Sequence, residues 1–188
     1  MNRFRRLCLS CFLLLPVAAL AGNDKVDPAS YICAELVSQP VTDGQPPVFT
    51  AMQMDGFAAA VLGNTVADPA SLAPALETAY QICQTKPADK VLDIWKEVRK
   101  RMPAPAKGES GDDGNKTVWR ADTAKCADYN ANQEDGSGFA VWLDGYNRGK
   151  KGISASILND DEVFQAFFAA CAKKPEALML DVLAETAR

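Results

Sequence analysis

Residues 80–95 of the chain read YQICQTKPADKVLDIW, and residues 168–183 read FAACAKKPEALMLDVL. The two stretches carry Cys, Lys, Pro, Leu and Asp in the same register, and aromatic or apolar residues match aromatic or apolar ones. An internal repeat outweighs other signals, because overlooking it leads to the wrong fold. Two copies are too few for a solenoid, so the repeat predicts tandem copies of one small domain.

Two further pairs of stretches support the repeat. CAEL at 33–36 matches CADY at 126–129, and DGFA at 55–58 matches SGFA at 137–140. Together the pairs divide the chain into unit 1 at 30–102 and unit 2 at 118–188. Residues 103–117 contain Pro, Gly, Ser and charged residues but no large apolar one, which is typical of a flexible linker that is stiffer at its prolines.

The first 21 residues have the pattern of a secretory signal peptide. Three arginines precede an apolar run over 7–20, which is too short to span a bilayer, and ALA at 19–21 is a cleavage site. A lipoprotein anchored through Cys8 or Cys11 is the alternative. Both cysteines begin the apolar run, however, whereas a lipid-modified cysteine follows it. We therefore expect a soluble protein exported into a bacterial periplasm, with no membrane span.

Removal of this segment takes away three of the 20 basic residues and none of the 24 acidic ones, which leaves a net charge of −7. An even number of cysteines remains, and in an oxidising compartment they are expected to form disulfides. Each unit has one early and one late cysteine, so the repeat predicts the pairs Cys33–Cys83 and Cys126–Cys171. Each bridge should stabilise its unit by about 3–4 kcal/mol. Free buried thiols are the alternative.

Apolar residues recur at helical spacing in both units. In unit 1 they predict a short helix near Cys33, a second one through 52–61, a third from Asp68-Pro69 to Cys83, and a last helix that Pro87 opens. Unit 2 has helical stripes at 139–146 and 164–171, a turn at 149–152, a cap at Asn159 and a last helix from Pro175. The predicted fold is all-α, with two small disulfide-stapled domains of about four helices each.

The composition excludes several kinds of chemistry. The chain has no histidine, which excludes His-dependent triads, His metal sites and a histidine switch between pH 5 and 8. It has no phosphate-binding Gly loop and no GxSxG motif, and its acidic clusters at 112–113 and 160–162 lack the spacing of a calcium loop. We expect no enzyme, no catalytic residue, no metal and no cofactor. The acidic balance argues against a nucleic-acid partner.

The paired-cysteine stretches resemble the HdeA/HdeB family of periplasmic acid-stress chaperones. Unit 2 is the closer match, mainly to the HdeB side, through FAVWL at 139–143, YNRGK at 146–150, Asp160 and CAKKP at 171–175. Unit 1 matches through CAE at 33–35, Gly56-Phe57 and the stretch 83–95. The resemblance covers most of the chain after residue 30.

The resemblance implies a small all-helical fold, one disulfide per unit, dimers at neutral pH and acid-triggered binding of unfolding client proteins. The family members carry one unit per chain, whereas this chain carries two. For this chain the resemblance therefore implies either a homodimer or an intramolecular pseudo-dimer. It also implies unfolded or acid-denatured periplasmic proteins as partners.

The charge balance is consistent with that role. Without histidine, only Asp, Glu and the C-terminus titrate below neutrality, and their full protonation takes the net charge from −7 to about +17. Self-repulsion then destabilises the compact state, so we expect loosening below about pH 4 while the disulfides keep each unit compact. The apolar stripes would then bind clients. The candidates are Met52, Met54, Phe57, Trp95, Phe139, Trp142, Phe164 and Phe167.

Other interpretations remain open. Apolar stripes at helical spacing are ordinarily core, although a conditional chaperone uses its core or interface as its binding surface. A periplasmic binding or immunity protein would bind one specific partner tightly at neutral pH, whereas a chaperone binds many clients and only in acid. A structural domain of the cell envelope with no activity of its own is a third possibility.

Overall fold

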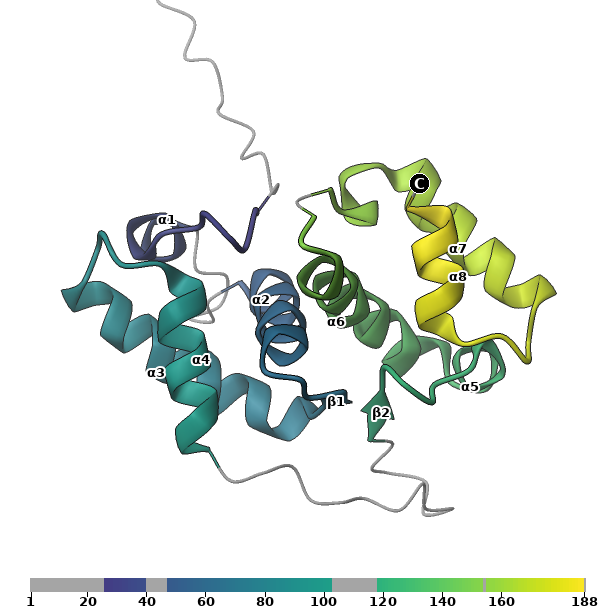
Figure 1. The fold of residues 1–188 in the computed structure, drawn as a ribbon, viewed down its shortest axis with the longest axis horizontal. Coiled ribbons are helices and arrows are strands. Elements are labelled where there is room, and N and C mark those ends of the chain that lie inside the picture. The colour runs from purple at the N-terminus through teal and green to yellow at the C-terminus, as the bar shows by residue number, and fades with distance from the viewer. Residues whose placement is uncertain (1–25, 40–46, 103–117, 154, 188) are drawn as a thin grey trace, which may run out of the picture.

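A computed structural model of the chain describes residues 26–39, 47–102, 118–153 and 155–187. Figure 1 shows the two predicted units, and the all-α fold is confirmed. Unit 1 contains α1 (Cys33–Ser38), α2 (Val48–Val61), α3 (Pro69–Thr85) and α4 (Val91–Arg101). Unit 2 contains α5 (Cys126–Ala131), α6 (Gln133–Lys151), the short 3-10 helix η1 (Ile157–Asn159), α7 (Asp161–Lys173) and α8 (Met179–Thr186). The predicted signal peptide and linker lie outside the described residues.

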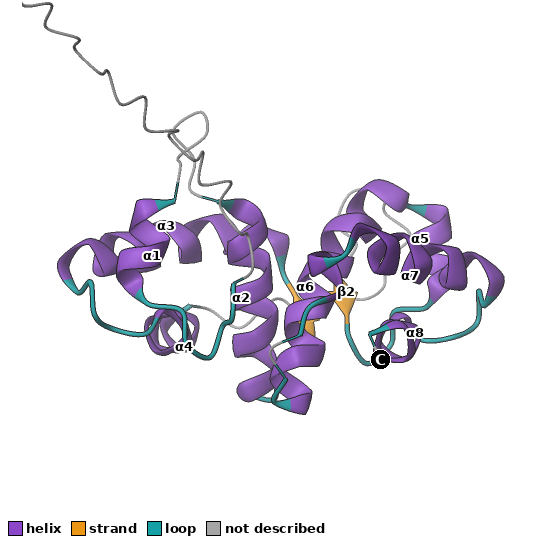
Figure 2. Ribbon diagram, turned by 90° about the horizontal axis from the view of Figure 1, so that it is seen from above, coloured by secondary structure: helices purple, strands orange, loops and turns teal. Residues whose placement is uncertain are grey.

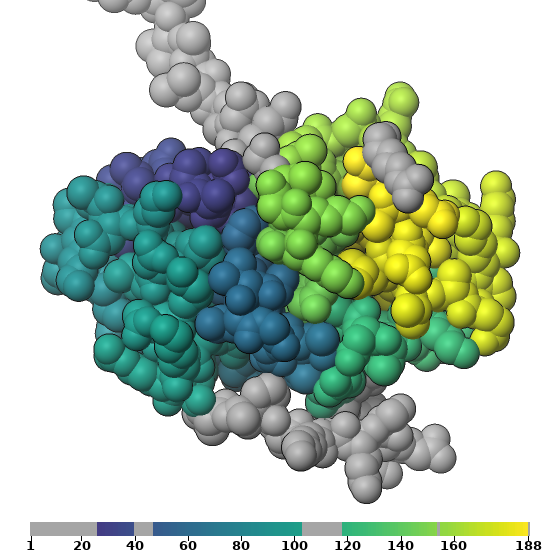
Figure 3. All heavy atoms as spheres, in the orientation of Figure 1, coloured from purple at the N-terminus to yellow at the C-terminus, as the bar shows by residue number. Residues whose placement is uncertain are grey.

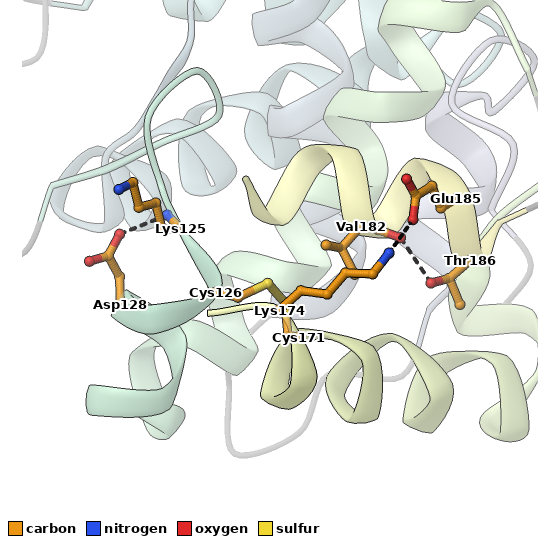
Figure 4. Close-up of a disulfide and its surroundings, with 8 residues drawn as sticks. All are labelled: Lys125, Cys126, Asp128, Cys171, Lys174, Val182, Glu185 and Thr186. Atoms are coloured by element: carbon orange, nitrogen blue, oxygen red, sulfur yellow. Dashed lines mark hydrogen bonds and ion pairs between the residues drawn. A yellow bond between two sulfur atoms is a disulfide. The ribbon is translucent and has the colours of Figure 1, made fainter. Parts of the chain in front are cut away.

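The two predicted disulfides are present, one in each unit. Cys33 of α1 is bonded to Cys83 of α3, and Cys126 of α5 is bonded to Cys171 of α7. Figure 4 shows the second bridge, with the ion pair between Lys174 and Glu185 close by, at 2.7 Å. Each bridge joins the short first helix of its unit to the long third one.

The Lys-Pro part of the repeat forms a turn that caps the first helix of its unit. In unit 1 the carbonyls of Pro87 and Asp89 accept hydrogen bonds from the amides of Ala34 and Cys33, at 2.9 and 2.8 Å. The first amides of a helix have no partner within the helix, so the turn satisfies them. Unit 2 repeats both contacts, from Ala127 to Pro175 and from Cys126 to Ala177.

This turn corrects the predicted starts of the last helices. Neither Pro87 nor Pro175 opens a helix; α4 begins at Val91 and α8 at Met179. The intervening residues lie outside a helix because their carbonyls are needed by the first helix.

Two further predictions in unit 2 were wrong in detail. The expected turn at 149–152 is the last turn of α6, which ends at Lys151 and is capped by Gly152 with φ of 65°. The left-handed backbone there explains the glycine. The N-cap of α7 is Asp160 and not Asn159, because the carboxylate of Asp160 accepts hydrogen bonds from the amides of Glu162 and Val163.

The two units meet along α2 and α6. Figures 1 and 2 show these helices side by side at the centre of the molecule, and Figure 3 shows the two halves in contact over one face. Each unit has a hydrophobic core around its disulfide, and the core of unit 2 also includes Ala59 and Ala67 of unit 1. A two-residue antiparallel pair, β1 (Val66–Ala67) with β2 (Trp119–Arg120), also joins the units. None of the described helices is long and apolar enough to cross a membrane.

Candidate functional site: the interface between the two units

Glycines allow α2 and α6 to approach very closely. A Cβ atom at Gly56 would fall well inside the contact distance of the backbone oxygen of Trp142, and one at Gly145 would do the same at the backbone oxygen of Gln53. Farther along α6, a Cβ at Gly149 would lie 2.7 Å from the backbone oxygen of Phe57. Any side chain at these positions would push the helices apart.

The crossing is reciprocal. Gln53 stands three residues before Gly56, and Trp142 stands three residues before Gly145, so each glycine packs on the equivalent position of the other helix. The structural equivalent of Asp55-Gly56 is therefore Asp144-Gly145. The match of 55–58 with 137–140 was wrong: Gly138 meets only the end of the Met52 side chain, at an ordinary 3.7 Å. The interface thus has the local pseudo-symmetry of a two-fold dimer interface.

Asp55 links three elements at this crossing. Its side chain is 1% exposed and accepts hydrogen bonds from the indole Nε1 atoms of Trp95 (2.8 Å) and Trp142 (2.9 Å). Arg99 of α4 binds the same carboxylate through Nε at 2.6 Å and Nη2 at 2.7 Å, and Arg99 Nη1 donates to Ser71. Each of the two carboxylate oxygens of Asp55 thus contacts two donors. Trp142 is the partner that comes from unit 2.

Asp144 occupies the equivalent place in unit 2 but has different partners. It is 1% exposed and accepts from Gln53 Nε2 of unit 1 at 3.2 Å, from the Ser156 hydroxyl at 2.6 Å and from the Ile157 amide at 3.1 Å. Burial raises the pKa of Asp144, although these hydrogen bonds and the charge of Arg148 act in the opposite direction. The two carboxylates therefore differ in environment despite the symmetry of the helices.

Arg148 is a buried cation at the same interface. Its side chain is 1% exposed, its Nη1 lies 3.8 Å from Asp144, and its Nη2 donates to the backbone carbonyl of Val26 at 2.8 Å. Val26 precedes the predicted start of unit 1 at residue 30, but its side chain belongs to the hydrophobic core of that unit, which therefore begins at residue 26 or earlier. The Nε and Nη1 atoms are buried without a hydrogen-bond partner. Burial lowers the pKa of Arg148, while the charges of Asp144 and Asp27 raise it.

Most of the predicted client-binding side chains are buried in this structure. Met54, Phe57, Trp95, Phe139, Trp142 and Phe167 are at most 6% exposed, and Met52 and Phe164 are partly buried. Met52 packs against the cores of both units. In unit 2 the rings of Trp119, Phe139, Trp142 and Tyr146 stack in a row, with successive centroids 5.0 to 5.7 Å apart.

The structure does not bring all eight candidates together. Met52 and Trp142 lie at the α2–α6 crossing, and the Asp55 carboxylate links Trp142 to Trp95. Phe164 and Phe167 belong to α7, where they contact Phe168 within unit 2. The eight residues are thus divided between the crossing and the interior of each unit.

Sequence reasoning missed the polar residues of the interface: Gln53, Asp55, Arg99, Asp144, Arg148 and the carbonyl of Val26. A signal for two of them was present, because Asp-Gly occurs at 55–56 and 144–145, with almost the same separation as Cys83 and Cys171. Arg148 lies within the YNRGK motif at 146–150, but nothing in the sequence pattern pointed to its burial or to its contact with Val26.

Among the described residues, no three His, Cys, Asp or Glu side chains are grouped as in a metal site. Comparison of the chain with protein-family models, with curated proteins and with solved structures found no match.

Proposed function

We propose that the protein is a periplasmic acid-stress chaperone of the HdeA/HdeB kind, and that the α2–α6 interface is its conditional binding surface. At neutral pH the two units close on each other as an intramolecular pseudo-dimer. Below about pH 4 they separate while each disulfide keeps its own unit compact, and the uncovered apolar side chains hold unfolding clients.

The interface itself is the observation that carries this proposal. It buries apolar and aromatic side chains around a helix crossing whose specific polar contacts between units include two carboxylates, Asp55 and Asp144. Asp55 uses both of its carboxylate oxygens in these contacts, since Trp95, Arg99 and Trp142 all donate to it.

Other carboxylates also favour loosening in acid. The pKa of Glu97, of Asp122 and of Glu176 is lowered, chiefly by hydrogen bonds from Lys100, Arg120 and Lys125 respectively. A lowered pKa means that the contribution to stability is present above the unfolded value and is lost as the pH falls through the folded one. All three groups are exposed, so each effect is small and is screened by salt.

Asp144 acts in the opposite direction. Because its pKa is raised in the folded state, its proton is bound more tightly in the folded than in the unfolded protein, and mild acid stabilises the fold through this group. Separation of the units must overcome the stabilisation that protonated Asp144 provides. We therefore expect the units to separate only at low pH, where the charge of the whole chain has become strongly positive.

The proposal is tested by suppression of light scattering from an aggregating client, scanned from pH 7 to 2, with ANS fluorescence of the protein alone. A locked variant makes the test specific to the interface. Val66 and Arg120 are Cα partners across the β1–β2 pair, so Val66→Cys with Arg120→Cys places a third disulfide between the units.

The matched control carries Val66→Ser and Arg120→Ser, which removes the same side chains without a bond. We expect wild type and control to suppress aggregation below about pH 4 and the locked variant to lose most of that activity. A wild-type protein that stays inactive and binds no ANS down to pH 2 contradicts the chaperone function. A locked variant as active as the control contradicts the interface as its surface.

A groove in unit 1 favours the second candidate function, a periplasmic binding or immunity protein. It lies between α3 and α4 and has a volume of about 480 Å³. Its lining combines the apolar side chains of Ile82, Ile94, Val98 and Met102 with polar and charged ones such as Glu97 and Arg101. Such a groove would bind one partner at neutral pH. Affinity capture from a periplasmic extract at pH 7, with Ile82→Glu as the variant that places a charge in the groove, tests it. One stoichiometric partner that the variant fails to capture would favour this function over the chaperone.

A further inference from the structure

We propose that residues 26–31, which we name the N-terminal strap, hold the two units together, and that Arg148 is the anchor of this strap. The strap belongs to unit 1, whereas Arg148 belongs to α6 of unit 2. The inference concerns separation of the units and does not depend on whether the protein binds clients.

The strap is an ordered part of unit 1. Val26 and Tyr31 are each 7% exposed and belong to the core of that unit. The carbonyl of Asp27 accepts from the amides of Ser30 (3.1 Å) and Tyr31 (2.9 Å), and the carboxylate of Asp27 accepts from the Ser30 hydroxyl at 2.9 Å. A closed turn of this kind places the Val26 carbonyl at a fixed point beside α6.

Arg148 joins that point to unit 2. Its hydrogen bond to the Val26 carbonyl, at 2.8 Å, crosses between the units, and its guanidinium is held on the other side by Asp144. In Figure 3 the purple N-terminal segment of unit 1 lies directly beside the green surface of unit 2.

Because Arg148 is buried, its contact with the strap couples opening of the strap to opening of the α2–α6 crossing. A buried guanidinium is tolerated only when charges and acceptors compensate it, and here Asp144 and Asp27 supply the charge while Val26 supplies the acceptor. If the strap leaves, Arg148 loses the hydrogen-bond acceptor that the Val26 carbonyl provides and must reach water. The strap and the end of the α2–α6 crossing should therefore open together.

Hydrogen exchange at single amides tests the strap. The amide of Ala121 donates to the carbonyl of Thr65 across the units at 2.8 Å, so its exchange reports separation of the units. The amides of Cys33 and Cys126 donate within their own units and report unfolding of each unit. The amide of Tyr31 reports the strap itself. Exchange is followed by NMR at neutral pH on the full mature chain.

Arg148→Met removes the anchor and keeps much of its length. We expect the exchange of Ala121 and of Tyr31 to become about tenfold faster, as for the loss of a charged hydrogen bond, with Cys33 and Cys126 unchanged. Val26→Ala loosens the strap from its own side and should have the same pattern. For Ala121 the double variant should be no faster than the faster single one, because either change breaks the same link that runs from unit 1 through the strap to Arg148.

Arg101→Met, which removes an exposed arginine at the end of α4, is the control and should leave all four amides unchanged. The proposal is overturned if Arg148→Met leaves Ala121 unchanged, or if it accelerates Cys33 and Cys126 as much as Ala121. If Arg148→Met does not fold, Val26→Ala is judged by the same two criteria.

Discussion

Asp144 and Asp55 show how one residue type has two roles at equivalent positions. Asp55 is paired with the guanidinium of Arg99, whereas Asp144 receives neutral donors from Gln53 and Ser156 and has Arg148 only at 3.8 Å. Desolvation therefore dominates at Asp144 and raises its pKa. The carboxylate of Asp55 ties Trp142 of unit 2 to α4 of unit 1.

Asp144→Asn tests the direction of that shift. A raised folded pKa contributes stability that is present below the unfolded value of about 3.9 and is lost as the pH rises through the folded value. The asparagine side chain of the variant does not titrate, so the variant does not lose this stability as the pH rises. We therefore expect the variant to be more stable relative to wild type at pH 7 than at pH 4.5. Urea unfolding at both pH values measures it, and a relative stability that falls from pH 4.5 to pH 7 would show that Asp144 is stabilised as an anion.

Glycines at the helix crossing determine how closely α2 and α6 pack. Gly56 and Gly145 each lie against the backbone of the other helix, and no methyl group fits there. Gly138 lies on the same helix α6 but faces only the flexible end of Met52. The two kinds of glycine look alike in the sequence, and their surroundings alone distinguish them.

Gly145→Ala and Gly138→Ala form a matched pair that tests the crossing. Gly145→Ala should destabilise the protein by about 1–3 kcal/mol, as overpacking of a tight contact does. Gly138→Ala should be neutral or stabilise by up to about 1 kcal/mol, because alanine is the better helix former and has room. Thermal or urea unfolding measures both variants. Equal effects would mean that the close approach of α2 and α6 does not hold.

At the scale of the whole molecule, local patterns predicted much of the fold and little of the interface. Cys83 and Cys171 with the Lys-Pro residues after them predicted the two units, their helices and their disulfides, because these contacts recur within each unit. Helix starts at Pro87 and Pro175 were wrong, since propensity does not show that the first helix needs the carbonyls of that turn. The Arg148–Val26 contact joins residues that are 122 positions apart in the sequence and belong to different units. No periodicity encodes a contact of that kind.

The central claim is that the units separate in acid while each unit remains stapled. Amide exchange of Ala121, compared with that of Cys33 and Cys126 from pH 7 to 3 and corrected for the intrinsic rate at each pH, tests it most directly. We predict that protection of Ala121 is lost below about pH 4 and that protection of both cysteine amides persists. Protection of Ala121 that survives at pH 3, or loss of all three amides together, would contradict the account.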